Sequence, residues 1–271
     1  MLFLFLLLTT LPISSAYPTI LIHGIFSNKN ELTEVNNYLQ NAGYETYNME
    51  IGNGKLDSIF MNMNKQCEVF SNNIEALNLK SDKINLLGIS QGGLIARCYL
   101  ERYSDKIKKV NSLITWATPH MGLYDKMDYS FIGYWKDPYN YKNYLEKNTF
   151  LPYINNELVH NESEKYKSNL QSLSNFVLFW SSIDTVITPI ESSQFEFYNI
   201  RIAEKEKKLV IQPLVESEVY KTLGLNELDE KLHLYEIDCI HNKFKERMCF
   251  EDTIVKQSDK SLIEITMGYL N

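Results

Sequence analysis

The 271-residue chain has no excess of positive charge, no linker-like segment and no internal repeat. Its 27 Lys and Arg residues are outnumbered by 34 Asp and Glu residues, which gives a formal net charge of −7. Nucleic acid needs a basic patch for its phosphates, so the charge argues against nucleic acid as a main partner. Because no Pro-, Gly- or Ser-rich stretch divides the chain, we expect one large folded domain with its own core.

Long apolar runs are also scarce, and the one at the N-terminus is short. Residues 1–16, "MLFLFLLLTTLPISSA", place an apolar stretch before small residues, with Ser14 and Ala16 spaced as at a cleavage site. An apolar core of about ten residues is too short to span a bilayer comfortably. The pattern predicts a signal peptide over 1–16, a mature domain over 17–271, and entry into the secretory pathway without a stable membrane span. Since no Lys or Arg precedes the run, an uncleaved anchor or a buried first strand are the alternatives.

Cysteine is rare, but the number of cysteines is even. Cys67, Cys98, Cys239 and Cys249 are the four cysteines of a chain expected in an oxidising compartment, which predicts two disulfides. Four cysteines allow three pairings, and proximity along the chain favours Cys239–Cys249, leaving Cys67–Cys98; free buried thiols are the alternative. The tripeptide at Asn161, "NES", is a candidate glycosylation site in a polar stretch.

Short apolar runs alternate with segments of helical spacing along most of the chain. Near-continuous apolar strands alternating with helices indicate a mostly parallel sheet that helices cover on both faces. The interval 124–172, rich in Tyr, Asn, Lys and Glu, interrupts this alternation and predicts an insertion after the fourth strand. The expected strands are 18–24, 44–51, 83–89, 110–118, 175–182 and 231–238, and the expected helices are 30–42, 56–79, 91–103 and a closing helix within 252–270.

The pentapeptide Gly88-Ile89-Ser90-Gln91-Gly92 lies between an expected strand and an expected helix. In this context the pattern G-x-S-x-G is typical of a nucleophilic serine on a tight turn. The glycines are needed because side chains there would collide with the neighbouring strand and helix. We therefore expect Ser90 to be a nucleophile; the alternative is an ordinary small residue at a turn.

A serine nucleophile needs a base and an acid that orients the base, in the chain order Ser, Asp or Glu, His. Of the five histidines, only His233 and His241 follow a late strand, and His233 lies within the strand itself. His241 comes in the loop after the sixth strand, and Asp184 directly follows the fifth. Asp238 is too close to His241 along the chain. The sequence predicts a Ser90–Asp184–His241 triad; a surface histidine and a turn-capping aspartate are the alternatives.

Acyl transfer also requires N–H donors for the negative oxygen of the tetrahedral intermediate. The backbone N–H of Gln91 directly follows the serine, and that of Ile25 lies in the loop after the first strand, where Gly24 permits close approach. His23 and His120 have no metal-ligand partners at useful spacing, so we interpret them as structural and expect no metal and no cofactor.

Five segments of the chain resemble the palmitoyl-protein thioesterases. They are "ILIHGIFSN", "LLGISQGGLIARCYLE", "GYWKDPYNYKNYLEKNTFLPYINNE", "SSIDTVITPIESSQFEFY" and "CIHNKF", and the similarity in order and spacing runs from about Pro18 to Phe250. "SQGG" and the third segment are more specific than G-x-S-x-G, and the third is most similar to the type 2 branch. The resemblance implies an α/β-hydrolase with its triad at Ser90, Asp184 and His241 and oxyanion donors at Ile25 and Gln91.

The resemblance also implies a substrate and a role for the insertion. Family members are lysosomal or secreted hydrolases that release fatty acids from thioesters. The resemblance therefore implies a lysosomal or secreted location and, as the expected partner, a fatty-acyl thioester of protein or of coenzyme A. The insertion then becomes a cap over the serine; as individual side chains, its residues could equally form the core of the insertion. An apolar acyl groove would be lined by Tyr134, Trp135, Tyr139, Phe150 and Leu151. Alternative functions are a lipase or carboxylesterase, an acyltransferase, and a catalytically silent binding protein of the same fold.

Overall fold

A computed structural model of the chain describes residues 16–125 and 133–271. Of the predicted signal peptide, only Ala16 falls within the described residues. Among the helices of these two ranges, none combines the length and the apolar character needed to cross a membrane.

The centre of the fold is a six-stranded sheet in which every neighbouring pair of strands is parallel. The strand order is β2-β1-β3-β4-β5-β8, and all six predicted strands are confirmed. The central strands are buried on both faces, which explains why they are nearly continuous apolar runs. The strands are β1 (Thr19–Ile22), β2 (Thr46–Met49), β3 (Lys83–Ile89), β4 (Lys109–Trp116), β5 (Asn175–Trp180) and β8 (Leu232–Glu236).

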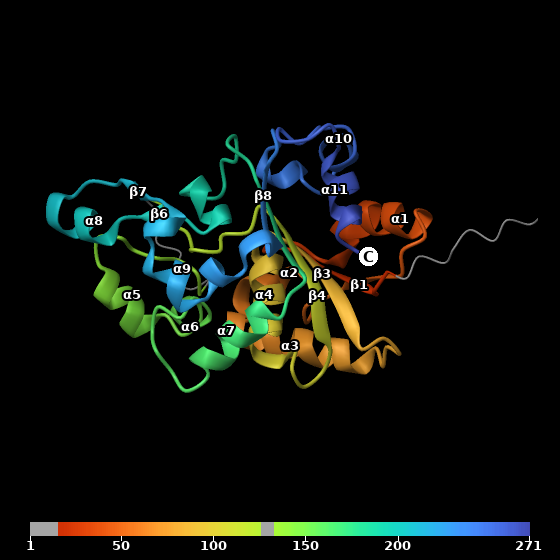
Figure 1. The fold of residues 1–271 in the computed structure, drawn as a ribbon, viewed down its shortest axis with the longest axis horizontal. Helices are drawn as coiled ribbons and strands as arrows, with labels where there is room; N and C mark the ends of the chain where they lie inside the picture. The colour runs from red at the N-terminus through yellow and green to blue at the C-terminus, as the bar shows by residue number, and fades with distance from the viewer. Residues whose placement is uncertain (1–15, 126–132) are drawn as a thin grey trace, which may run out of the picture.

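Helices pack on both faces of this sheet and form two apolar cores with it (Figure 1). One core joins the sheet to α1, α10 and α11, and the other joins it to α3, α4 and α7. The predicted α/β-hydrolase class is therefore confirmed. The bounds of these helices are α1 (Thr33–Asn41), α3 (Met63–Ala76), α4 (Gln91–Tyr103), α7 (Ser163–Gln171), α10 (Arg247–Phe250) and α11 (Leu262–Gly268).

The single long helix predicted over 56–79 is wrong, because the chain forms two helices there. α2 (Lys55–Phe60) ends where Met61 takes up an extended conformation, with φ −75° and ψ 128°. Asn62 then caps α3 by accepting a hydrogen bond from the Lys65 backbone N–H at 2.9 Å. An asparagine at this position satisfies an N–H at the helix start that has no partner within the helix.

Short elements gather beside the sheet and come from two separate segments (Figure 1). The first lies in the predicted insertion, whose last helix, α7, packs against α4. The second, between β5 and β8, was not anticipated. We call these short elements together the cap: α5 (Tyr141–Lys147) and α6 (Leu151–Ile154) from the first segment, and β6 (Phe197–Tyr198), α8 (Ile200–Glu206), β7 (Ile211–Gln212) and α9 (Glu218–Thr222) from the second.

Two disulfides tie neighbouring segments, with the pairing favoured by the sequence. Cys67 and Cys98 join α3 to α4 with their Cα atoms 6.2 Å apart. Cys239 and Cys249 join the end of the β8 segment to α10 with Cα atoms 5.9 Å apart. The first bridge links the helix that begins at the predicted nucleophile to its neighbour on the same face of the sheet.

Candidate active site

Ser90 occupies the turn between β3 and α4 in a backbone conformation that few residues adopt, with φ 54° and ψ −126°. The turn is possible only because the residues two positions before and after Ser90, Gly88 and Gly92, lack side chains. A Cβ on Gly88 would lie 2.4 Å from the Cα of Gly93, and a Cβ on Gly92 would lie 2.3 Å from the carbonyl oxygen of Ile22. The glycines of the pentapeptide therefore serve the steric role inferred from the sequence.

Strand β4 holds the same turn by hydrogen bonds. The Ser90 backbone N–H donates to the Trp116 carbonyl at 2.9 Å, and the Thr118 hydroxyl donates to the Ser90 carbonyl at 2.9 Å. A Cβ on Gly93 would collide with Thr118, only 2.0 Å from its Oγ1. The serine is thus fixed by the backbone and by the strand beside it.

The structure brings the three predicted triad side chains into one hydrogen-bonded chain. His241 Nε2 lies 3.0 Å from Ser90 Oγ, and His241 Nδ1 lies 2.7 Å from Asp184 Oδ2. The residues follow β3, β5 and β8, whose carboxyl ends share one edge of the parallel sheet. Ser90 and His241 are each 9% exposed and Asp184 is 8% exposed, so water has little access to the chain of bonds. Chemically, this arrangement can transfer the serine proton to the imidazole.

The Asp184 carboxylate is oriented by the loop that follows it. Its Oδ1 accepts hydrogen bonds from the backbone N–H groups of Val186 at 2.7 Å and Ile187 at 3.1 Å, which leaves Oδ2 for His241. The rival carboxylate, Asp238, is instead paired with Lys256 at 2.8 Å and is half-exposed. Among the two acids considered from the sequence, only Asp184 reaches the imidazole.

The loop after β1 lies directly against the serine. A Cβ on Gly24 would be 3.1 Å from the Ser90 Cβ, so a side chain at this position would press against the serine. Ile25 follows directly and is partly buried against the apolar core. His23, which is 1% exposed, braces this loop: its Nδ1 lies 2.9 Å from the Gly24 carbonyl oxygen and its Nε2 lies 2.9 Å from Glu50 Oε1. His23 is structural, as the sequence indicated.

His120 is buried away from the triad. Its Nε2 lies 3.0 Å from the Thr115 hydroxyl, and its ring stacks on Phe195 with centroids 4.4 Å apart. Burial, followed by the positive charge of Arg97, lowers the pKa of His120 well below its ordinary value. A neutral, enclosed imidazole of this kind supports packing, which matches its structural interpretation.

The five residues predicted to line an acyl groove divide into two environments. Tyr134, Phe150 and Leu151 are buried in the apolar core, whereas Trp135 and Tyr139 are partly buried and both rings pack against Tyr124. Asn161, the predicted glycosylation site, is exposed in the turn before α7. The groove and the glycan stay predictions.

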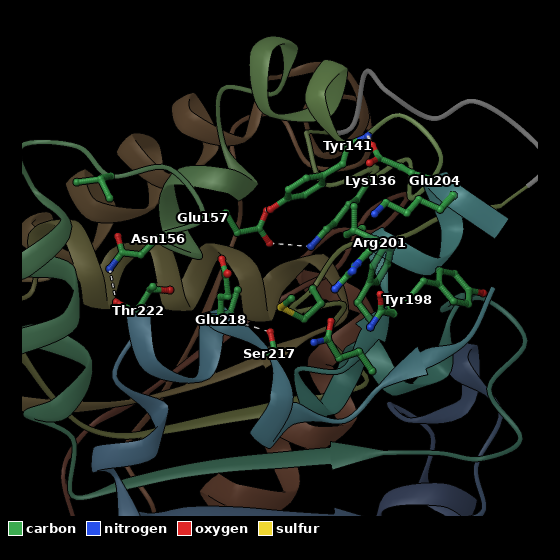
Figure 2. Close-up of a pocket in the computed structure, with 18 residues that line it drawn as sticks. Lys136, Tyr141, Asn156, Glu157, Tyr198, Arg201, Glu204, Ser217, Glu218 and Thr222 are labelled. Atoms are coloured by element: carbon green, nitrogen blue, oxygen red, sulfur yellow. Dashed lines mark hydrogen bonds and ion pairs between the residues drawn. The ribbon is translucent and has the colours of Figure 1, made fainter. Parts of the chain in front are cut away.

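A cavity of about 670 Å³ lies within the cap, between its two segments (Figure 2). A buried ion pair forms part of its wall, with Lys136 Nζ 2.7 Å from Glu157 Oε1. Arg201 on α8 and Glu218 on α9 add charged groups to the lining. No sequence pattern marked these residues, because the two walls come from segments on either side of β5. The lining contains none of the three triad residues.

No group of three or more His, Cys, Asp or Glu side chains gathers in the described ranges in a way that could hold a metal ion.

Comparison with known proteins agrees with this geometry. The family model described as palmitoyl protein thioesterase matches residues 18–129 and 126–241, an interval that contains Ser90, Asp184 and His241. The chain belongs to the palmitoyl-protein thioesterase family. Membership supports thioester hydrolysis as its activity and confirms the resemblance on which the sequence interpretation drew.

Relatives of the chain match most of its length. It is 34% identical to palmitoyl-protein thioesterase 3 from Dictyostelium discoideum, over 84% of this chain and 86% of that protein. It is 31% identical to lysosomal thioesterase PPT2-B from Xenopus laevis, over 78% and 81% of the two chains. Human lysosomal thioesterase PPT2 is 27% identical, over 76% and 78%.

Solved structures support the same fold. A serine hydrolase involved in carbazole degradation superposes with a TM-score of 0.51 at 18% identity, covering 94% of this chain and 90% of that one. An esterase from Pyrococcus furiosus gives a TM-score of 0.52 at 15% identity, covering 95% and 81%. At these identities the similarity establishes the α/β-hydrolase fold alone.

Proposed function

We propose that this thioesterase-family protein is a serine hydrolase that cleaves fatty-acyl thioesters with Ser90, Asp184 and His241 as its catalytic residues. The observation that carries the proposal is the hydrogen-bonded chain from the Ser90 hydroxyl through the His241 imidazole to the Asp184 carboxylate. The strained turn at Ser90 and the burial of all three residues support it.

The reaction proceeds in two steps through an acyl-enzyme. His241 Nε2 takes the Ser90 proton as Oγ bonds to the acyl carbon, and the carbonyl oxygen becomes an anion that the N–H groups of Ile25 and Gln91 stabilise. The carbon–sulfur bond then breaks, and the imidazolium gives its proton to the departing sulfur. A water molecule then gives a proton to His241 as its oxygen bonds to the acyl carbon. The bond between that carbon and Ser90 Oγ breaks, the fatty acid leaves, and His241 returns the proton to Ser90 Oγ. Asp184 holds the imidazole and stabilises its charged form.

The substrate is a palmitoyl-type thioester of a protein or of coenzyme A, with its acyl chain in a groove lined by cap residues. The names of the relatives, which specify palmitoyl-protein and lysosomal thioesterases, support this class and a lysosomal or secreted location. The two disulfides and the exposed sequon at Asn161 are consistent with the secretory pathway. In this proposal, residues 1–16 are a signal peptide and 17–271 a single hydrolase domain.

Replacing the nucleophile tests the proposal most directly. Ser90→Ala removes the attacking oxygen, so turnover of a palmitoyl thioester should fall about a millionfold, as for other serine nucleophiles. Covalent labelling by a fluorophosphonate should disappear at the same time. Ser172→Ala, at an exposed serine at the end of α7, is the control and should keep both activities. A Ser90→Ala protein that retains near-normal turnover would overturn the assignment.

Matched substrates separate the alternatives. A palmitoyl thioester and the corresponding oxygen ester should differ in kcat/KM in favour of the thioester; a preference for the oxygen ester would identify a lipase or carboxylesterase instead. Transfer of the acyl group to an alcohol would indicate an acyltransferase. A folded protein that neither reacts with the fluorophosphonate nor turns over either substrate would be a binding protein of hydrolase fold.

A further inference from the structure

The side-chain amide of Gln91, the residue after the serine, is buried in a hydrogen-bonded cluster. Its Nε2 donates to the Ser58 carbonyl at 2.9 Å and to Gln66 Oε1 at 3.0 Å. Its Oε1 accepts from the Tyr134 hydroxyl at 3.0 Å. Gln91, Gln66 and Ser58 are each 1% exposed and Tyr134 is 2% exposed, so water cannot replace these partners.

The direction of every bond in the cluster follows from two backbone carbonyls. The Ser58 carbonyl can only accept, so Gln91 must turn Nε2 toward it. Gln66 Nε2 donates to the Met61 carbonyl at 2.7 Å, so Gln66 presents its oxygen to Gln91. Gln91 Oε1 therefore faces Tyr134, whose hydroxyl must donate. Burial raises the pKa of that hydroxyl further above its ordinary value, which keeps the proton in place.

The cluster joins three parts of the chain at the turn after Ser90. Ser58 lies in α2 and Gln66 in α3, while Tyr134 follows β4 at the start of the first cap segment. All of them contact the side chain of the first residue of α4. These bonds hold the Gln91 side chain in place and so restrain its Cα, to which the backbone nitrogen is directly bonded. A shift of the amide that moves this Cα therefore also moves the Gln91 backbone N–H.

We infer that Tyr134 is a positioning residue that aligns the Gln91 backbone N–H through the Gln91 amide. The inference rests on the proposed function, in which that N–H stabilises the oxyanion. It assigns Tyr134 a role different from the groove contact expected from the sequence. A groove residue affects substrates according to their chain length, whereas a residue that aligns an oxyanion donor affects all substrates equally, through kcat.

Tyr134→Phe is the test, because it removes the hydroxyl and keeps the buried ring. Without the donor, Gln91 Oε1 is buried and unpaired, and the amide must move to find a partner. Loss of a whole oxyanion donor lowers kcat about 100- to 1000-fold, so a misaligned donor should lower it roughly 10- to 100-fold. KM should stay within about twofold, because the ground-state carbonyl depends little on this donor. Hexanoyl, decanoyl and palmitoyl thioesters should lose kcat by the same factor.

Tyr99→Phe is a matched control on the same helix. Tyr99 is fully buried and lies about two helical turns after Gln91. Its hydroxyl donates to the Lys108 carbonyl and accepts from the Lys108 backbone N–H, each at 3.0 Å, and so takes no part in the Gln91 cluster. This change also deletes a buried, hydrogen-bonded hydroxyl, so it should lower the thermal midpoint much as Tyr134→Phe does. Its kcat should match that of the wild-type enzyme, which separates positioning from general loss of stability.

A double-mutant cycle with Gln91→Met completes the test. Methionine keeps the backbone N–H and removes the acceptor, so Tyr134→Phe should cause no further loss of kcat in the Gln91→Met background. Additive losses, a normal kcat for Tyr134→Phe, or a loss that grows with chain length would each overturn the inference. A wild-type enzyme inactive on every thioester would instead overturn the proposed function, so the two failures are distinguishable.

Discussion

Two regions of the molecule are held in place by different means. One is the edge of the sheet that carries Ser90, Asp184 and His241, which we propose to be catalytic, and the other is the cap. At the edge, backbone geometry and close glycine contacts position Ser90, and the loops after β5 and β8 deliver Asp184 and His241. In the cap, elements of two to seven residues bury apolar side chains in the core and are also joined by polar pairs, such as Lys136 with Glu157 and Tyr134 with Gln91. At the tightest points of the edge, only glycine fits without a steric clash. In the cap, a buried polar side chain needs its partner, because an unpaired polar group is costly to bury.

The Lys136–Glu157 pair illustrates how the cap is stabilised. Lys136 is 3% exposed, and its Nζ lies 4.7 Å from the centre of the Phe197 ring, which belongs to the other cap segment. Glu157 Oε1 accepts from Lys136 and also from the Asn155 amide at 3.2 Å. The Lys136 ammonium group thus contacts both cap segments, so its removal should destabilise both of them.

Of the variants that compare these two regions, Asp184→Asn at the edge should have the largest effect. The Asp184 carboxylate accepts a hydrogen bond from the N–H at His241 Nδ1, which leaves Nε2 free to receive the serine proton. The neutral amide of asparagine does not enforce this tautomer, so kcat should fall about 10⁴-fold while the fold stays intact. Steady-state kinetics and circular dichroism measure both. Asp238→Asn is the control, since that carboxylate pairs with Lys256. Loss of activity from Asp238→Asn instead would show that the acid had been assigned to the wrong residue.

Lys136→Met should mainly affect the stability of the cap. Removing one partner of a buried ion pair leaves Glu157 uncompensated and should cost about 3–5 kcal/mol in the free energy of unfolding. Denaturant unfolding measures the loss, and limited proteolysis should locate the new cleavage sites in the cap. Lys142→Met removes the exposed pair with Glu146 in α5 and should change neither measurement. Equal effects of the two variants would contradict the distinction between the buried and exposed pairs.

The last effect is a pH dependence of stability and concerns Glu101. This residue lies on α4, which begins at the Ser90 turn and also contacts the cap. Arg97, one turn before it, lies 3.3 Å from Glu101 and also binds Asn155 of the cap. Burial raises the pKa of Glu101 from 4.5 to about 8, although Arg97 and Arg102 oppose the shift. The folded state therefore holds a proton that the unfolded state releases, and the stability contributed by this group is lost as pH rises from about 4.5 to about 8.

Glu101→Gln removes this titration and so tests the sign. Because glutamine stays neutral, the thermal midpoint of the variant should rise relative to that of the wild type as the pH increases from about 5 to about 8. Thermal unfolding across that range measures the difference. A gap between the two proteins that stays constant with pH would contradict the assigned shift.

Much of the edge could be predicted because its signals are local. Each strand is a short apolar run bounded by polar residues, and Ser90 is marked by the glycines around it. The break in the helix predicted over 56–79 was missed although Asn62 is a typical N-cap, because the apolar spacing continues across it. The cap strands were missed because β6 and β7 have two residues each, too few to show a period.

The sequence by itself determined the six strands, the tight turn at Ser90 and the order in which Ser90, Asp184 and His241 follow their strands. Each depends on neighbours along the chain, where apolar periodicity and glycine sterics act directly. Only the tertiary structure decided that His241 lies 3.0 Å from Ser90, that Lys136 meets Glu157, and that the Tyr134 hydroxyl donates to Gln91. These contacts join residues distant in the chain, and they form only when strand order and packing bring the partners within hydrogen-bonding distance.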